Sequence, residues 1–369
     1  MNKTRVLVCP LDWGLGHATR CIPIIRELIQ LDAEVIVAGD GDAINLLKGQ
    51  FPQLAFIYFK GYRIKLFKHL PAGASLLFQI PAILYRITQE NRQLQKLVTN
   101  HQISIVISDN RYGLWNSKVR SVFITHQPNI IPPFLPAFIG PLLRSITRYF
   151  IRKYDECWIP DYEGENNLSG KLSHGFMLPS NVRFIGPLSR FDTEIKSYAL
   201  SKNEMINSNF DLVALVSGPE PQRSNFERLL KSQLVKSPLK SLLLRGKLAD
   251  DNLIEKNDNL TVIDHLSADD LFIILNDRPI VICRGGYSTL MDISITGNKA
   301  ICIPTPGQTE QEYLAVKGHI EHTVVYASQK DFELVNCLSV INNTTGLRID
   351  NDKLEYRLHV KRIMQLFTE

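Results

Sequence analysis

A glycine-rich loop that ends in a histidine follows the first apolar run of the chain. Residues 10–20 read PLDWGLGHATR and come directly after RVLVC. Gly14 and Gly16 permit a tight turn at the start of a helix, whose free N–H groups can bind an anion or a polar ligand. His17 lies on the first turn of that helix, and the ordinary pKa of a histidine suits a general base. His17 is therefore the candidate catalytic residue, and a helix-capping histidine is the alternative interpretation.

The same loop fits a dinucleotide-binding fingerprint only in part. Such a fingerprint has a third glycine where this chain has Thr19, although Asp40 ends the next expected strand where a ribose-binding acid would stand. A nicotinamide cofactor is therefore the weaker interpretation.

Three loops in the second half of the chain also join a strand to a helix. Residues 217–223 read SGPEPQR and could hold a phosphate through a hydroxyl, backbone N–H groups and a guanidinium. Residues 283–292 read CRGGYSTLMD, a turn rich in hydrogen-bond donors that is followed by an acid able to accept from sugar hydroxyls. Residues 304–315 read PTPGQTEQEYLA, in which Gln308, Gln311 and Glu312 can form hydrogen bonds to hydroxyls. Each is also an ordinary strand-to-helix turn, so only their combination is informative. The candidate ligand-binding residues are Ser217, Gly218, Arg223, Arg284, Gly285, Gly286, Ser288, Thr289, Asp292, Gln311 and Glu312.

Short β-branched runs alternate with segments of helical period, which predicts an α/β protein with mostly parallel sheets. Strands are expected near 4–9, 33–38, 54–58, 103–107, 120–124, 156–159, 211–216, 241–245, 260–263, 279–283 and 299–303. Helices are expected over 22–31, from 222, 267, 288, 308 and 329, and over 352–367. The pattern predicts Rossmann-like halves at 1–186 and 210–350, a linker at 187–209, and a C-terminal helix within 351–369 that packs back on the first half. Ligands of open α/β sheets bind beyond the carboxyl ends of the strands, so these loops predict a cleft between the halves.

Composition sets the broad class. The chain has 369 residues, of which 44% are hydrophobic and 21% charged, as in a globular protein large enough for two domains. A net charge of +5 is too small to predict nucleic-acid binding. The six scattered cysteines are expected to be buried thiols, which together with the lack of a visible signal peptide predicts a cytoplasmic location. The longest uncharged stretches contain prolines, so no membrane span is expected.

Together these motifs resemble those of GT-B glycosyltransferases, most closely the family 28 type that includes the N-acetylglucosaminyltransferase of peptidoglycan lipid-intermediate synthesis. The resemblance spans nearly the whole chain. The family's glycine-rich loop ending in histidine is matched by GLGH at 14–17, and its histidine-containing acceptor loop by THQPN at 125–129. Its later motifs are matched by Cys283, Arg284, Gly286, Thr289 and Asp292, and by Gln311, Glu312 and Tyr313.

The resemblance implies two Rossmann-like domains facing across a cleft. It implies transfer of a hexosyl or N-acetylhexosaminyl group from a nucleotide diphosphate sugar, most simply a UDP-sugar, to a glycan or lipid-linked acceptor. Inversion would be expected, and no metal or other cofactor, because helix N-termini and arginine can stabilise the leaving diphosphate.

The resemblance also implies roles for single residues. His17 would deprotonate or position the acceptor hydroxyl, and Asp292 would hold the ribose of a donor bound by the C-terminal half. The donor diphosphate would be surrounded by Ser217, Gly218, Gly286 and Ser288, and the donor sugar held by Gln311 and Glu312. The acceptor would be bound by Gly14, Gly16, Arg20, His126 and Gln127.

This sequence departs from the family pattern in two loops. Glu312 is an acid where the family usually has an amide, which leaves the identity of the donor sugar open. The loop SGPEPQR contains two prolines and Glu220, so it offers fewer N–H groups to a phosphate. The D-x-D sequences at 40–42 and 350–352 are interpreted as helix caps rather than metal sites.

Two apolar stretches carry basic residues, at 65–87 and 132–153. The second combines apolar and basic side chains in a way that suits an anionic membrane surface. We hypothesise that this surface recruits a lipid-linked or membrane-bound acceptor at the inner face of the membrane, although helices packed on the sheet are the simpler alternative. The residues concerned are Phe134, Leu135, Phe138, Leu142, Leu143, Arg144, Arg148, Arg152 and Lys153.

Two other functions compete with glycosyl transfer. A nucleotide-sugar 2-epimerase or hydrolase of the same fold would release UDP without an acceptor. A non-catalytic protein that binds sugar nucleotides or glycans would keep the fold without turnover.

Overall fold

The computed structural model describes residues 3–61, 72–131, 139–191, 209–247, 254–348 and 355–365. The chain forms two compact units, one of Met1–Leu188 with Asp352–Glu369 and the other of Ser189–Asn351. The first unit is thus built from two separate stretches of the chain. The division between the units falls close to the start of the linker expected at 187–209, most of which lies outside the described residues.

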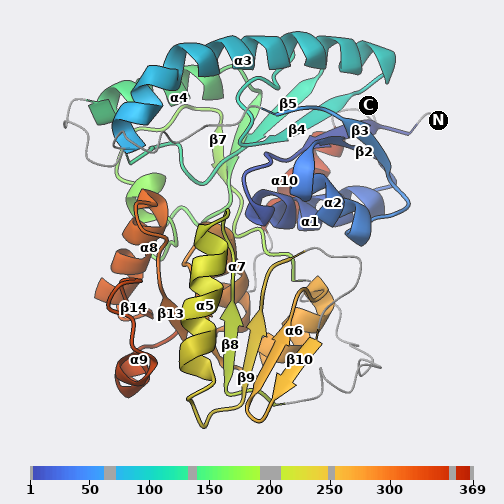
Figure 1. Ribbon diagram of the computed structural model, residues 1–369. Coiled ribbons are helices and arrows are strands. Elements are labelled where there is room, and N and C mark those ends of the chain that lie inside the picture. The colour runs from blue at the N-terminus through green and yellow to red at the C-terminus, as the bar shows by residue number, and fades with distance from the viewer. Residues whose placement is uncertain are drawn as a thin grey trace. The chain divides into compact units, whose positions relative to one another are not determined.

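The first unit contains a parallel sheet of seven strands in the order β3-β2-β1-β4-β5-β6-β7 (Figure 1). The order reverses between β1 and β4, and this switch point is where open α/β sheets bind ligands. The strand β7 was not expected, because its three residues include an exposed arginine and give no periodic apolar signal. The strands are β1 (Arg5–Cys9), β2 (Glu34–Gly39), β3 (Ala55–Tyr58), β4 (Ile105–Asp109), β5 (Arg120–Ile124), β6 (Glu156–Ile159) and β7 (Val182–Phe184).

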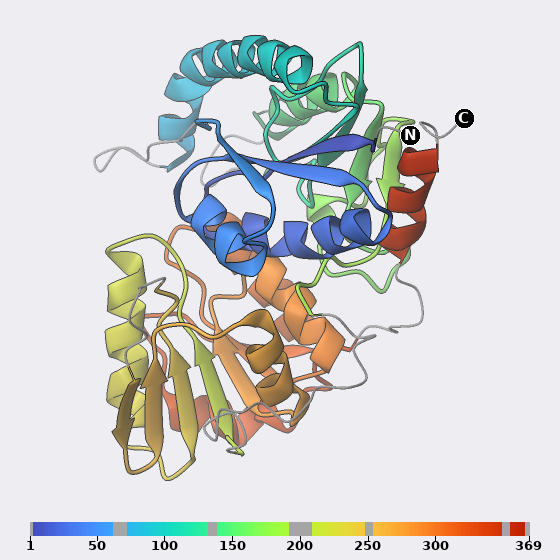
Figure 2. The same ribbon diagram turned by 90° about the vertical axis from the view of Figure 1, so that its right-hand side faces the viewer.

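Helices cover both faces of this sheet, as Figures 1 and 2 show. One face carries α1 (Leu15–Gln30), α2 (Gly41–Gln50) and α10 (Glu355–Gln365). The other carries α3 (Ala72–Asn100) and α4 (Ile139–Ile151), and a short 3-10 helix, η1 (Gly170–Leu172), follows β6. Leu94 and Val98 of α3 pack in one core with Leu7 and Val106 of the sheet.

The helix α1 is buried on most of its surface. Ile22, Ile24 and Ile25 are all buried, whereas Ile29 is exposed. The wide buried surface arises because α1 contacts β2, α2 and α10. The attachment of α10 includes a hydrogen bond from Arg362 Nη2 to Glu156 Oε1 of 2.7 Å.

The second unit contains another sheet of seven strands, in the order β10-β11-β9-β8-β12-β13-β14. All neighbours pair in parallel except β10 and β11, and the order reverses between β8 and β12. The sequence pattern missed β10, an edge strand with the polar sequence IEKN, and the short β14. The strands are β8 (Leu212–Leu215), β9 (Ser241–Leu244), β10 (Ile254–Asn257), β11 (Leu260–Ile263), β12 (Ile280–Cys283), β13 (Ala300–Cys302) and β14 (Val324–Tyr326).

Helices again lie on both faces of the second sheet. The helices α5 (Gln222–Leu234) and α9 (Leu334–Ile341) share one apolar core with the sheet. On the other face lie α6 (Ala268–Asn276) and α7 (Tyr287–Thr296), and α8 (Thr309–Ile320) connects β13 to β14 (Figure 2). The helix expected from 329 begins only at Leu334, because Ser328 and Asp331 form a hydrogen-bonded turn before it.

Among the described helices, none combines the length and the apolar composition needed to cross a membrane.

Candidate functional site

Two strand ends meet at the switch point of the first sheet and bring a histidine to an aspartate. The neighbours β1 and β4 pair in parallel with Cys9 opposite Ser108, so the loop after β1 lies beside the end of β4. Gly14, with a φ of 81°, turns the chain into α1. On the first turn of α1, His17 Nδ1 lies 2.9 Å from Asp109 Oδ1. The side chain of Asp109 is fully buried, whereas that of His17 is 12% exposed.

Arg20 joins this pair to a second histidine. Its Nε and Nη2 donate to both carboxylate oxygens of Asp109. Its Nη1 donates to Nδ1 of His126 at 2.8 Å, and its Nη2 lies 2.7 Å from Nδ1 of His17. Because His126 follows β5, three neighbouring strand ends contribute side chains to one cluster.

The charges of the cluster leave His17 ready to accept a proton. Burial alone would raise the pKa of Asp109, but Arg20 and His17 outweigh it and lower that pKa to about 2. Burial is the largest cause that lowers the pKa of His17, and Arg20 lowers it further against the opposing effect of Asp109. At neutral pH Asp109 is therefore ionised and His17 neutral. An imidazole that donates Nδ1–H to Asp109 keeps a lone pair on Nε2.

Arg20, a predicted acceptor-binding residue, is a central member of this cluster. It is only 1% exposed and directs its guanidinium to Asp109 and the two histidines, so it organises the cluster. His126 is buried as well, whereas Gln127 and Gly16 are half-buried and Gly14 is exposed.

Two residues of this region were overlooked in the sequence. Asp109 ends a fully buried strand, and an acid at that position is the signal that could have identified it. Trp13 lies in the glycine-rich loop and is 52% exposed, so the loop presents an aromatic side chain shortly before His17.

The switch point of the second sheet places the loops after β8 and β12 side by side. Gly285 has a φ of +69°, and a Cβ there would lie 3.2 Å from Cβ of Cys302, so both conformation and space favour glycine. Gly286 is the N-cap of α7 and has no side chain to cap the helix. Ser288 and Thr289, on the first turn of α7, are half-buried. The N-terminus of α7 thus keeps the form expected of an anion-binding turn.

Arg284, beside this turn, links three loops at the carboxyl edge of the sheet. Its Nη1 donates to Gln329 Oε1 at 2.6 Å and to the carbonyl oxygens of Ile303 and Pro304, and its Nη2 donates to the carbonyl of Gln222 at 2.9 Å. The guanidinium lies over the Phe226 ring, 3.8 Å from its centroid. Burial lowers the pKa of Arg284 to about 10. Among the described residues no carboxylate forms an ion pair with Arg284, and its Nε has no hydrogen-bond partner there.

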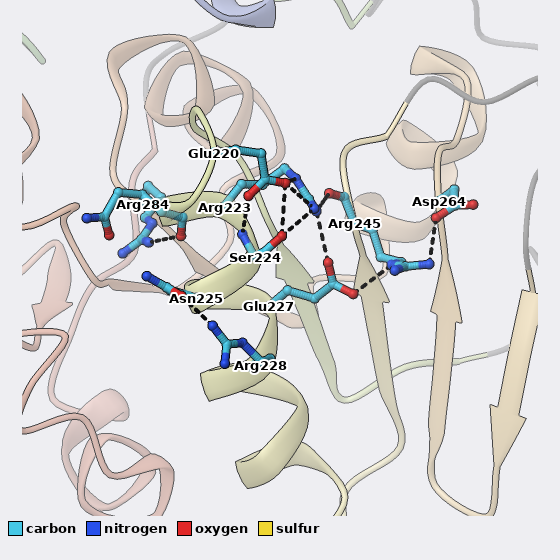
Figure 3. Close-up of polar contacts among 10 residues, drawn as sticks. Glu220, Arg223, Ser224, Asn225, Glu227, Arg228, Arg245, Asp264 and Arg284 are labelled. Atoms are coloured by element: carbon cyan, nitrogen blue, oxygen red, sulfur yellow. Dashed lines mark hydrogen bonds and ion pairs between the residues drawn. The ribbon is translucent and has the colours of Figure 1, made fainter.

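Arg223, predicted to contact a phosphate, is paired with two glutamates of its own loop and helix. Figure 3 shows its guanidinium within a chain of charged groups: Nε donates to Glu220 at 2.8 Å and Nη1 to Glu227 at 2.9 Å. Glu220 in turn accepts a hydrogen bond from the N–H of Ser224, so a carboxylate of the chain itself occupies the start of α5. Arg223 is thus paired with carboxylates of its own chain, and its contact with a phosphate stays a prediction. Ser217 and Gly218, earlier in the loop, are exposed.

Asp292, on the second turn of α7, is held by the first two residues of the second unit. Its Oδ1 accepts from Ser189 Oγ at 2.7 Å and from the N–H of Arg190 at 3.4 Å, and its Oδ2 accepts from Arg190 Nε at 2.9 Å. Burial raises the pKa of Asp292, while Arg190 and Ser189 oppose that rise. Neither Ser189 nor Arg190 was singled out in the sequence.

Gln311 and Glu312, at the start of α8, support their own loop. The N–H of Thr305 donates to Gln311 Oε1 at 2.8 Å, and the N–H of Gly307 donates to Glu312 Oε1 at 3.0 Å. A Cβ on Gly286 would lie 4.0 Å from Gln311 Nε2, which places this amide near the start of α7. In the described contacts, both side chains thus accept hydrogen bonds from the loop before α8. Their contact with the donor sugar stays a prediction.

No group of three or more metal-ligating side chains occurs among the residues that the structure describes. Asp40, the first acid of one D-x-D sequence, stands at the N-cap position of α2, but its side chain accepts from the N–H of Gly61 and does not cap the helix. The other D-x-D sequence, at 350–352, lies outside the described residues.

The second unit matches a known domain family. Residues 232–346 match the glycosyltransferase family 28 C-terminal domain. The second unit therefore resembles the C-terminal domain of family 28 glycosyltransferases. This match includes the loops that carry Arg284, Asp292 and Gln311, and it supports glycosyltransferase activity. No curated protein shows a significant match to the sequence.

Solved structures show that the fold is GT-B, with two Rossmann-like units. The spinosyn rhamnosyltransferase SpnG is 14% identical with a TM-score of 0.61, over 99% of this chain and 96% of SpnG. The spinosyn forosaminyltransferase SpnP is 15% identical with a TM-score of 0.58, over 100% and 96% of the two chains. The glycosyltransferase SnogD from Streptomyces nogalater is 15% identical with a TM-score of 0.54, over 99% and 95%. SpnG has also been solved with thymidine diphosphate and with spinosyn aglycone.

Proposed function

We propose that this protein transfers a hexosyl group from a nucleotide diphosphate sugar, in the first instance a UDP-sugar, to a hydroxyl group of a glycan or lipid-linked acceptor. The observation that carries the proposal is the contact of His17 with Asp109 at the switch point of the first sheet. The family 28 domain supports donor binding by the second unit. The complexes of SpnG with thymidine diphosphate and with an aglycone support the same division into a nucleotide donor and a separate acceptor.

In the proposed reaction His17 is the general base. The acceptor hydroxyl gives its proton to His17 Nε2, and its oxygen forms a bond to the anomeric carbon while the bond from that carbon to the diphosphate breaks. Attack opposite the leaving group inverts the anomeric carbon. Asp109 stabilises the imidazolium that forms, because its carboxylate lies 2.9 Å from Nδ1 and is ionised at neutral pH.

The leaving diphosphate gains negative charge as that bond breaks. The N-terminus of α7 at Gly286 offers N–H groups and the positive end of the helix dipole. Arg284 adds a buried positive charge beside it, with no carboxylate ion pair among the described contacts. We propose that these groups stabilise the diphosphate without a metal ion. Gln311, whose amide nitrogen lies near the start of α7, is the proposed contact for the transferred sugar.

We also propose that the acceptor is reached at an anionic membrane surface on the cytoplasmic side. In the described part of the second apolar stretch, Leu142 and Tyr149 are exposed on α4, seven residues apart and hence on one helical face. Met177 is exposed as well, and Arg144, whose guanidinium lies 5.8 Å from the centroid of the Phe176 ring, is close to that segment. Exposed apolar side chains with basic neighbours suit an interface with anionic lipid. Phe134, Leu135 and Phe138 lie outside the described residues.

Liposome flotation tests the membrane proposal. The protein should float with vesicles that contain phosphatidylglycerol and not with pure phosphatidylcholine vesicles. Tyr149→Glu should reduce the bound fraction several-fold, whereas Tyr58→Glu, a matched change at an exposed tyrosine of β3, should not. An equal bound fraction with and without phosphatidylglycerol would rule out this proposal.

The transfer proposal is tested first by nucleotide binding. Thermal unfolding is measured with UDP, GDP, dTDP and their common sugar conjugates, because a ligand of the folded state raises the midpoint according to its affinity and concentration. Stabilisation by one nucleotide diphosphate, followed by acceptor-dependent release of that nucleotide, is expected. His17→Ala should keep donor affinity and lose turnover. Release without any acceptor would indicate an epimerase or hydrolase, and binding without turnover would indicate a non-catalytic protein.

A further inference from the structure

The carboxylate of Asp292 already accepts three hydrogen bonds from its own chain. Oδ1 accepts from Ser189 Oγ and from the N–H of Arg190, and Oδ2 accepts from Arg190 Nε. An ionised carboxylate offers about four acceptor positions, two on each oxygen. Among the contacts of the described residues, both positions on Oδ1 are used and one position on Oδ2 is left.

The groups that hold Asp292 are fixed by further contacts. The side chains of Asp292 and Arg190 are 5% and 18% exposed, so they form a largely buried ion pair. Removing the cation from a buried carboxylate is costly, which keeps Arg190 in place. Ser189 Oγ also accepts from the N–H of Phe191 at 3.2 Å, and the Phe191 ring packs 5.3 Å from that of Phe272. The arrangement around Asp292 is therefore a defined turn that a weakly bound ligand would not displace.

This occupancy limits what Asp292 can bind. A ribose presents two adjacent hydroxyl groups, and a carboxylate that holds both normally uses one acceptor position on each oxygen. Oδ1 has none left, so Asp292 can accept from one hydroxyl only.

Building on the proposed function, we propose that Asp292 holds the ribose of the nucleotide through a single hydroxyl. The donor site then accepts 2′-deoxyribonucleoside diphosphates as readily as ribonucleoside diphosphates. The 3′-hydroxyl, which both classes possess, fills the remaining position on Oδ2. The 2′-hydroxyl finds no acceptor on Asp292, and its absence has little effect on affinity.

Calorimetric titration of the full-length protein with UDP and 2′-deoxy-UDP tests this inference, since the two ligands differ by one hydroxyl. Their dissociation constants should agree within about threefold, because no hydrogen bond to a charged group is lost. A preference for UDP of more than tenfold would overturn the inference and leave the proposed function intact. Failure of UDP, 2′-deoxy-UDP, GDP and dTDP alike to bind would overturn the proposed donor site and this inference with it.

Ser189→Ala tests whether the occupied positions cause the lack of discrimination. The variant removes one donor from Oδ1 and keeps the ion pair with Arg190, so the fold should persist. With one position available on each oxygen, Asp292 can hold both hydroxyls, and the preference for UDP over 2′-deoxy-UDP should rise at least fivefold. Ser294→Ala is the matched control, because this buried serine of α7 donates to the Met291 carbonyl. An unchanged ratio in Ser189→Ala would refute the explanation.

Discussion

Replacing Asp109 by asparagine removes the charge that orients His17 while preserving the shape of the side chain. In the native cluster, Nδ1 of His17 lies between Asp109 Oδ1 at 2.9 Å and Arg20 Nη2 at 2.7 Å. With Asp109 ionised, His17 donates Nδ1–H to it and keeps the Nε2 lone pair for the acceptor. Without that charge, Arg20 is the stronger partner, so Nδ1 accepts a hydrogen bond and the ring proton moves to Nε2, where it blocks the base.

The size of the effect follows from the hydrogen bond that is lost. A hydrogen bond to a charged group contributes about 1.5–3 kcal/mol, and about 1.4 kcal/mol corresponds to a factor of ten in rate. Asp109→Asn should therefore lower kcat about 10- to 150-fold, with little change in donor affinity because the donor loops belong to the other unit. Breaking a buried ion pair also destabilises a fold by about 3–5 kcal/mol, so the assay is nucleotide release at a temperature where the variant is folded.

Glu90→Gln is the matched control for this experiment. Glu90 and Arg111 form another buried carboxylate–guanidinium pair in the first unit, and among the described residues Glu90 makes no contact with His17. The two variants should lose similar stability in thermal unfolding, yet only Asp109→Asn should lose rate at a temperature where both are folded. Equal loss of kcat in both variants, or a kcat for Asp109→Asn within threefold of wild type, would refute the reasoning.

Three further outcomes are expected. The acid limb of kcat/KM should lie below pH 6.5, because burial lowers the pKa of His17 and activity is lost as pH falls through it; a limb at or above pH 6.5 would contradict this role. Asp109 should stabilise the fold fully above about pH 5 and progressively less as pH falls towards its pKa of about 2. Denaturant titrations at several pH values measure this loss of stability, and in Asp109→Asn this part of the loss should be absent. Arg284→Met should lower the unfolding midpoint of the second unit by about 5–10 °C, since several carbonyls lose a donor, while Arg228→Met, at an exposed arginine, should not.

The sequence predicted the elements with strong apolar periodicity and missed those without it. Buried parallel strands such as β1 and β12 are short β-branched runs, and their loops stand where the pattern placed them. The strands β7, β10 and β14 have three or four residues each, and β10 is mostly polar, so pairing with a neighbour, rather than local composition, defines them.

The candidate site was predictable where a residue's position depends on its own loop, and not where it depends on strand order. His17 follows from the glycines around it, but its partner Asp109 lies 92 residues away and reaches it only because β4 pairs with β1. Local spacing carried a signal that was overlooked in one case. Glu220 and Glu227 stand three and four residues from Arg223, the spacing of helical ion pairs, which already favoured internal pairing over phosphate binding.

The packing of α10 on α1 makes synthesis order relevant to folding. The first unit needs residues 355–365 to cover α1, yet the ribosome makes them only after the roughly 160 residues of the second unit. At about 5–20 residues per second, the nascent first unit waits about 10–30 s with that surface of α1 uncovered. The second unit is complete at Asn351, just before the ribosome reaches α10 at Glu355, so the unit begun first is the one completed last.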